Sequence, residues 1–363
     1  YSAYVVAKGG GQAVRTAAVV RREGEAFDVT LKYIGRDGRP ARFYSSALTG
    51  LSGPGADHDF YANDMSGTVK IRVPRGGYLL DTKIYQDPED SAKGVDWLAR
   101  PKLDVTKDMT LTVDARKAKP VDITVPDKDA RQVHAWPRYQ TMSGDGGQMF
   151  LDSFAPLRTA HLGPEVTDGP LHQQWSGHWV KGADEQYDIL VGGKVDRFAT
   201  GYTKHVEAAD LATVRVGLGA SATGKEGVAG VAGKLPGGMG RIDAWDVPQR
   251  ARSTRTFHVS TEDKVKWHSR FLQLAVDENG AQSDEAEYYV LSPQTFKAGR
   301  TYTKEFNTAV FGPRLGYDLG ISREGNKITG FVPVAADGAG RLFVMDKWRY
   351  HPGIAALREK SLA

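Results

Sequence analysis

The chain has 363 residues, enough for about two or three domains with separate hydrophobic cores. Its 48 basic and 44 acidic side chains leave a formal charge of +4, a balance that argues against nucleic-acid binding through clustered Lys and Arg. The absence of cysteine excludes disulfides, thiolate zinc sites and thiol nucleophiles, and no apolar run approaches the ~20 residues of a membrane-spanning helix.

The composition is typical of an all-β protein. Gly, Thr, Val, Tyr and Asp are abundant, whereas apolar residues repeated at helical spacing over the length of a helix are scarce. We therefore expect an all-β fold of tandem β-sandwich domains. The exception is the tail at residues 344–363, where one short helix is predicted over residues 354–360, after Pro352 and Gly353.

Residues 1–26 have the pattern of two strands around the glycines at positions 9–11. Two strands cannot bury a hydrophobic core by themselves. We therefore expect this hairpin to be the end of a preceding immunoglobulin- or fibronectin-like domain. In that interpretation Tyr1 is either a processed end or a position inside a longer protein.

Residues 27–126 are predicted to form one β-sandwich. Apolar side chains alternate from Phe27 to Tyr33, and the following Asp37-Gly38 pair is a strong turn signal. Residues 109–113 and 121–125 show the same two-residue period of a half-buried strand.

Residues 67–85 are the most informative stretch of this sandwich. An alternating strand ends at a Pro-Arg-Gly-Gly break over residues 74–77, because proline cannot donate to a strand ladder and glycine tolerates positive φ. A second strand follows, with Tyr78, Leu80 and Ile84 expected on one face. This pair of strands resembles those of transthyretin-like or carboxypeptidase-regulatory sandwiches, modules that usually accompany an enzyme.

Residues 132–343, after a polar linker at 127–132, are predicted to form a larger sandwich or jelly-roll-like region. An acidic hairpin loop is expected at residues 277–280. The strands are predicted at residues 188–191, 213–218, 256–260, 270–276, 287–291 and 327–334.

Residues 217–240 contain nine glycines, and we interpret them mainly as a mobile loop. Within them, residues 219–225 match the skeleton of a phosphate-binding loop. However, Glu226 stands where Ser or Thr would bind magnesium, and the residues that follow are poor helix formers. A flexible hairpin loop is the favoured interpretation.

The candidate metal ligands form no recognised motif. His172 and His178 would lie about 20 Å apart along one strand, too far to share an ion. Oxygen-rich turns at residues 145–147 and 277–287 lack the alternating register of a calcium loop, so turn solvation is favoured and no cofactor is expected.

Three aromatic residues, Trp175, Trp179 and Tyr187, are the candidate ligand contacts. Flat rings cover sugar faces well, so the three could form a carbohydrate-stacking platform. Packing in the core is the favoured alternative. No catalytic residue is predicted, because no nucleophile elbow and no convincing pair of acids is present.

Several stretches, taken in order, resemble the region downstream of the catalytic domain in large secreted actinobacterial subtilisin-like serine peptidases. The stretches span residues 1–340 and are residues 13–17 (AVRTA), 27–31 (FDVTL), 35–38 (GRDG), 66–76 (SGTVKIRVPRG), 115–126 (ARKAKPVDITVP), 298–313 (AGRTYTKEFNTAVFGP) and 336–340 (ADGAG).

The resemblance implies secretion and a position after a protease domain. It transfers no catalytic residue, because the family's Asp-Thr-Gly, His-Gly-Thr-His and Gly-Thr-Ser-Met-Ala signatures are absent from these residues. After Gly340 the chain departs from the family, since residues 341–363 become charged and partly helical in pattern where the family continues in strands.

The sequence thus predicts a non-catalytic accessory region. It would bind a protein or polysaccharide substrate or a surface, or stabilise an upstream protease domain, with neither nucleic acid nor a membrane span involved. The alternative is a secreted structural protein that self-associates through exposed strand edges. A third hypothesis is a hydrolase whose site, in residues 132–343, would need a pocket with convergent His, Asp and Ser groups.

Overall fold

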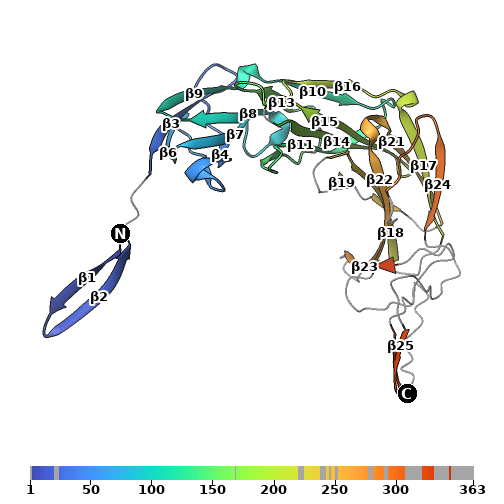
Figure 1. Ribbon diagram of the computed structural model, residues 1–363. Helices are drawn as coiled ribbons and strands as arrows, with labels where there is room; N and C mark the ends of the chain where they lie inside the picture. The colour runs from blue at the N-terminus through green and yellow to red at the C-terminus, as the bar shows by residue number, and fades with distance from the viewer. Residues whose placement is uncertain are drawn as a thin grey trace. The chain divides into compact units, whose positions relative to one another are not determined.

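The fold of this chain is all-β, as predicted. The computed structural model describes residues 2–19, 24–167, 169–219, 225–237, 243–244, 247–249, 252–276, 280, 282–289, 293–306, 321–330 and 343–344. Within them, the chain forms 27 strands, and helix is confined to five 3₁₀ turns of three residues each (Figure 1). None of these helices is long or apolar enough to cross a membrane. The predicted helix at 354–360 and the rest of the tail after 344 lie outside the described residues.

The chain divides into two compact units. Unit 1 comprises Tyr1–Lys119 and Arg158–Val166, and unit 2 comprises Pro120–Leu157 and Thr167–Ala363. This division differs from the domain boundary predicted at 126–132. The reason is a long-range backbone pairing: the N–H of Leu162 donates to the carbonyl of Ala99 at 2.7 Å, so a later segment returns to unit 1.

Unit 1 begins with the predicted hairpin. Strands β1 (Ser2–Gly9) and β2 (Gln12–Val19) pair antiparallel around Gly10 and Gly11, whose φ angles are positive. They form a separate two-stranded sheet. Their assignment to a preceding immunoglobulin-like domain stays a prediction.

The rest of unit 1 is a sandwich of two sheets. One sheet has the order β6-β3-β9, and the other contains the neighbours β13-β8-β7-β4-β5. Three 3₁₀ turns, η1 (Gly53–Gly55), η2 (Ser91–Lys93) and η3 (Ala115–Lys117), lie in the connections. The strands are β3 (Ala26–Ile34), β4 (Tyr44–Gly50), β5 (Asp59–Ala62), β6 (Thr68–Pro74), β7 (Gly76–Tyr85), β8 (Val95–Val105), β9 (Met109–Asp114) and β13 (Leu157–His161).

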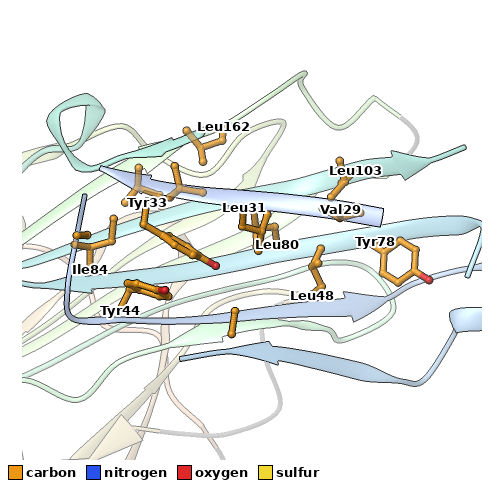
Figure 2. Packing of buried hydrophobic residues seen from close by; sticks show 14 of the residues in the cluster. Val29, Leu31, Tyr33, Tyr44, Leu48, Tyr78, Leu80, Ile84, Leu103 and Leu162 are labelled. Carbon is orange, nitrogen blue, oxygen red and sulfur yellow. The ribbon is translucent and has the colours of Figure 1, made fainter. Parts of the chain in front are cut away.

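Both sheets contribute to one hydrophobic core. Val29 and Leu31 from β3 are buried with Leu48 from β4 and with Tyr78 and Leu80 from β7 (Figure 2). The alternation predicted over residues 27–33 is therefore confirmed, because every second side chain of β3 enters this core.

The two strands of residues 67–85 lie in different sheets rather than in one hairpin. β6 pairs with β3, whereas β7 pairs with β4 and β8. Gly76 permits the crossing, because a Cβ there would lie 2.2 Å from the carbonyl oxygen of Ser52. The hydroxyl of Tyr78 then donates to the carbonyl of Pro74 at 2.7 Å and ties the two ends of the break together.

Unit 2 contains two large sheets. One has the order β12-β11-β14-β15-β21-β17-β24, and the other the order β19-β18-β22-β23-β27, with β20 also paired to β18. Two 3₁₀ turns, η4 (Ala208–Asp210) and η5 (Glu262–Lys264), precede β17 and β22. The strands are β11 (Arg131–Gln140), β12 (Gly146–Gln148), β14 (Leu171–Lys181), β15 (Glu185–Val195), β17 (Leu211–Leu218), β18 (Lys225–Lys234), β19 (Asp243–Ala244), β20 (Val247–Gln249), β21 (Thr254–Ser260), β22 (Lys266–Val276), β23 (Gln282–Tyr289), β24 (Thr301–Phe306) and β27 (Phe343–Val344).

Two further strand pairings are described in this unit, and the second of them is a separate two-stranded sheet. β10 (Lys119–Thr124) pairs parallel with β16 (Tyr202–His205), and β25 (Ile321–Glu324) pairs antiparallel with β26 (Lys327–Gly330). The predicted hairpin around residues 277–280 is confirmed, because β22 and β23 pair antiparallel from Val276 and Gln282 onward.

The glycine-rich segment contains a strand, so its interpretation as a mobile loop was wrong over residues 225–234. The hairpin loop predicted at residues 219–225 lies almost entirely outside the described residues. Ten residues of the glycine-rich segment form β18, which pairs with β22, and Ala229 and Val231 are fully buried. Glycine is required here for close packing. A Cβ at Gly233 would lie 2.5 Å from Cδ2 of Leu190, and one at Gly227 would lie 2.6 Å from Cδ1 of Leu218.

We predict that Gly233→Ala destabilises the chain by about 1–3 kcal/mol, because the added methyl group overfills a packed core. Thermal or urea unfolding would measure the loss. Gly24→Ala is the matched control, since a Cβ at Gly24 meets no atom within 4 Å, and its stability should stay within about 0.5 kcal/mol of the parent. Equal effects of the two substitutions would contradict the packing role.

Candidate functional site

A cavity of about 610 Å³ opens beside the C-terminal half of β15. Its volume lies within the ~300–1,000 Å³ range of small-molecule sites. The lining comes from four separate parts of unit 2: β14–β15, β16, the residues that follow β18, and η5. The lining residues are Gln173, Gly192, Gly193, Lys194, Val195, Tyr202, Lys204, Leu235, Pro236, Glu262, Asp263 and Lys264.

The cavity exists because β15 loses its partner strand. β21 pairs with β15 only from Glu185 to Asp188. Beyond that point side chains replace the strand ladder: the N–H of Leu190 donates to Oγ of Ser260 at 3.0 Å, and the Ser260 hydroxyl donates to the Leu190 carbonyl at 3.0 Å. The N–H of Gly192 donates to Oδ2 of Asp263 at 3.1 Å.

The η5 turn that supplies Asp263 is strained. Asp263 and the next residue, Lys264, both have φ of 55°, in the left-handed region that costs a residue with a Cβ about 1–2 kcal/mol. Two such residues in succession at the rim of a cavity indicate that the surrounding contacts impose the conformation. The hydrogen bond from Gly192 is one of these contacts.

The charges of the lining divide into paired and unpaired groups. Nζ of Lys204 lies 2.6 Å from Oε1 of Glu262, and the Asp263 carboxylate accepts the Gly192 hydrogen bond. Both acids of the lining therefore hold the structure of the turn. Lys194 and Lys264 are exposed and form no ion pair with any described residue.

Tyr202 and Gln173 provide the neutral polar groups of the lining. The Tyr202 ring stacks on Trp175 at 5.0 Å, and burial, with Asp263 and Glu262 nearby, raises the pKa of Tyr202 to about 12. Its hydroxyl is therefore a neutral donor at physiological pH. Gln173 is 7% exposed, and its amide oxygen accepts a hydrogen bond from the N–H of Ala199 at 3.0 Å, which leaves its amide nitrogen for a ligand.

His172 lies next to this lining in the β14–β15 ladder, directly opposite Lys194. Burial lowers the pKa of His172, and the Lys194 ammonium lowers it further. Both effects favour the neutral form of the imidazole.

The three predicted aromatic contacts do not form a stacking platform. Trp175, Trp179 and Tyr187 have exposed fractions of 1%, 5% and 6%, so none presents a ring face to solvent. Trp179 and Tyr187 are cross-strand neighbours in β14 and β15, and Tyr187 stacks on His258 at 4.5 Å. The three side chains are packed in the interior, which is the alternative that the sequence favoured. Trp175 contributes to the cavity indirectly, as the support of Tyr202.

A convergent His–Asp pair exists, but it lies away from the cavity. Nδ1 of His178 is 2.5 Å from Oδ1 of Asp188, and the Gln186 amide donates to the same oxygen at 2.7 Å. His178 and Asp188 are both buried, and neither lines the cavity. The pair that the hydrolase hypothesis would need is therefore enclosed in the sheet.

The described residues contain no group of three or more His, Asp or Glu side chains placed to hold a metal ion. In the turn before β12, the hydroxyl of Ser143 donates to Asp145 at 2.6 Å. Residues 277–279 and 281 of the second oxygen-rich loop, and residues 220–224 of the phosphate-loop skeleton, lie outside the described residues. Lys225 begins a strand, whereas a phosphate-binding loop would require a helix there.

The cavity lining is not recognisable from the sequence. Its parts are separated by up to 91 positions, from Gln173 to Lys264, and residues 262–264 carry no motif. The Gly192-Gly193 pair was the one local signal, because it interrupts the apolar pattern of β15.

No family model matches the chain, and no curated protein matches it. Among solved structures, the Bacillus anthracis TIE protein is similar with 9% identity and a TM-score of 0.17, over 84% of this chain and 57% of that one. A putative adhesin from Bacteroides ovatus has 9% identity and a TM-score of 0.18, over 52% of this chain and 98% of that one.

The major pilin subunit of Bacillus cereus has 8% identity and a TM-score of 0.18, over 77% of this chain and 99% of that one. This chain thus spans little more than half the length of the TIE protein. Identities and TM-scores this low support no functional argument, so function is argued from the residues of the cavity.

Proposed function

We propose that this chain is a non-catalytic binding region of a protein that works outside the cell. The β15 cavity is the observation that supports this proposal. Both of its carboxylates accept hydrogen bonds from backbone or lysine groups, and Lys194, Lys264 and the Tyr202 hydroxyl are placed in the lining as donors. An arrangement of fixed donors around a solvent-open cavity suits the recognition of a ligand better than proton transfer, which would need an uncommitted base.

The extracellular location and the partner are finer parts of the same proposal. The ordered stretches that resemble the post-catalytic region of subtilisin-like serine peptidases support an upstream protease domain as the partner. In that role the chain would hold the protease near a protein or polysaccharide substrate, or near a surface.

The binding proposal predicts retention on an insoluble polymer. Purified chain would be mixed with cell wall, chitin or immobilised casein, and the bound fraction measured by sedimentation. We expect retention on at least one polymer, and a loss of retention when Lys194→Glu places an acid in the cavity. Lys266→Glu is the control, because Lys266 is exposed but does not line the cavity. No retention on any polymer would contradict the proposed function.

Self-association is a second candidate function, supported by the β1–β2 hairpin. Tyr4, Val5 and Val14 have exposed fractions of 71%, 58% and 66%, a high exposure for apolar side chains on a two-stranded sheet. Such a sheet gains stability when another strand or sheet covers it.

Light scattering at increasing concentration would test this candidate. We expect the average mass to rise with concentration, and Val5→Lys with Val14→Lys to suppress the rise by placing charges on the apolar faces. A constant monomer mass at high concentration would exclude self-association.

A further inference from the structure

The β15 cavity has a charge pattern that selects among ligand classes. It contains three lysines and two acids, but Glu262 is paired with Lys204 and Asp263 holds the Gly192 amide. Asp263 keeps its negative charge while it accepts the Gly192 N–H, so the unpaired ammonium groups of Lys194 and Lys264 leave the lining with a net positive charge. Two ammonium groups at one cavity favour an anionic ligand.

The backbone of β15 excludes an extended peptide as the favoured ligand. A peptide that added a strand to this edge would need the N–H groups of Leu190 and Gly192. Ser260 and Asp263 already accept both. The side-chain groups left for a ligand are the two ammonium groups, the Tyr202 hydroxyl and the Gln173 amide nitrogen.

These four side-chain groups are suited to bind a sugar ring that carries a carboxylate group. A tyrosine held flat against Trp175 offers a rigid ring and a neutral hydroxyl, and both suit a polyhydroxylated ring. The Gln173 amide is fixed by its bond to Ala199, so it is preorganised as a donor. Gly193 adds no side chain, and a Cβ there would meet no atom within 4 Å, so the wall stays open at this position.

We propose that the β15 cavity binds an acidic saccharide unit, with Lys194 and Lys264 pairing with its carboxylate and with Tyr202 and Gln173 binding its hydroxyl groups. This inference rests on the proposed binding function and names the ligand class. In it, the strained η5 turn places the Lys264 ammonium at the rim.

Titration calorimetry with two matched probes tests the inference. One probe is a short oligogalacturonate, and the other is the same oligosaccharide with its carboxylates methyl-esterified, which removes the charge and keeps the rings. A short polyglutamate is the third probe, with charge but no ring. We expect the oligogalacturonate alone to bind well, and its affinity to fall as salt rises from about 50 to about 500 mM.

Two variants remove the proposed cationic contacts. Lys264→Gly deletes the ammonium and relieves the positive φ, so the fold should be retained or stabilised. Lys194→Gln replaces the other ammonium with an amide. Each should weaken oligogalacturonate binding by about tenfold, the effect of losing one charge-assisted contact. Lys266→Gln, outside the cavity, should stay within about twofold of the parent.

Equal affinity for the esterified and the free saccharide would overturn the inference. So would unchanged affinity in a folded Lys264→Gly and a folded Lys194→Gln variant. Tighter binding of polyglutamate than of oligogalacturonate would assign the cavity to acidic peptides and also overturn it. In each of these cases, retention of the chain on a polymer would still support the proposed binding function. If the chain is neither retained on a polymer nor binds any probe in the calorimeter, both the binding function and the acidic-saccharide inference are wrong.

Discussion

The substitution of side chains for a β-strand along β15 is the interaction on which the site depends. After Asp188 the strand loses β21, and unpaired backbone groups there would cost free energy or attract another strand. Ser260 and Asp263 satisfy the amides of Leu190 and Gly192 instead. These two side chains occupy the backbone donors of the edge, so another strand cannot pair with it there. They do not fill the space beside the edge, and the cavity in that space can admit a small ligand.

Satisfying the Gly192 amide with the Asp263 carboxylate requires strained backbone in the η5 turn. To bring the Asp263 carboxylate to the Gly192 amide, the η5 turn holds two consecutive residues in the left-handed region. The Lys204–Glu262 ion pair joins the same turn to β16, the strand that supplies Tyr202. The turn therefore contributes both to the edge of the sheet and to the lining of the cavity.

The sequence predicted those features that depend on local periodicity. The alternation in residues 27–33 located β3 and its core face, and the break at residues 74–77 located the end of β6. It did not predict that β6 and β7 belong to different sheets, because pairing is decided by contacts distant in the chain. The return of residues 158–166 to unit 1 was hidden for the same reason.

Composition alone left two features wrongly or incompletely assigned, and each has a physical reason. The glycine-rich segment was interpreted as a loop, although glycine also serves where sheets pack closely, as Gly233 does against Leu190. The aromatic residues Trp175, Trp179 and Tyr187 could be assigned to a surface or a core only once their burial was known. The cavity could not be found from sequence, since its lysines and its glutamine become neighbours only in the folded sheet.

Native-state hydrogen exchange at the amides of Leu190 and Gly192 tests most directly whether side chains replace the strand ladder. We expect both amides to be protected from exchange in the parent chain. In Asp263→Gly, which removes the carboxylate without adding strain, protection of Gly192 should fall while that of Leu190 is kept. Exchange of both amides at the rate of an unstructured peptide, or unchanged protection of Gly192 in the variant, would contradict it.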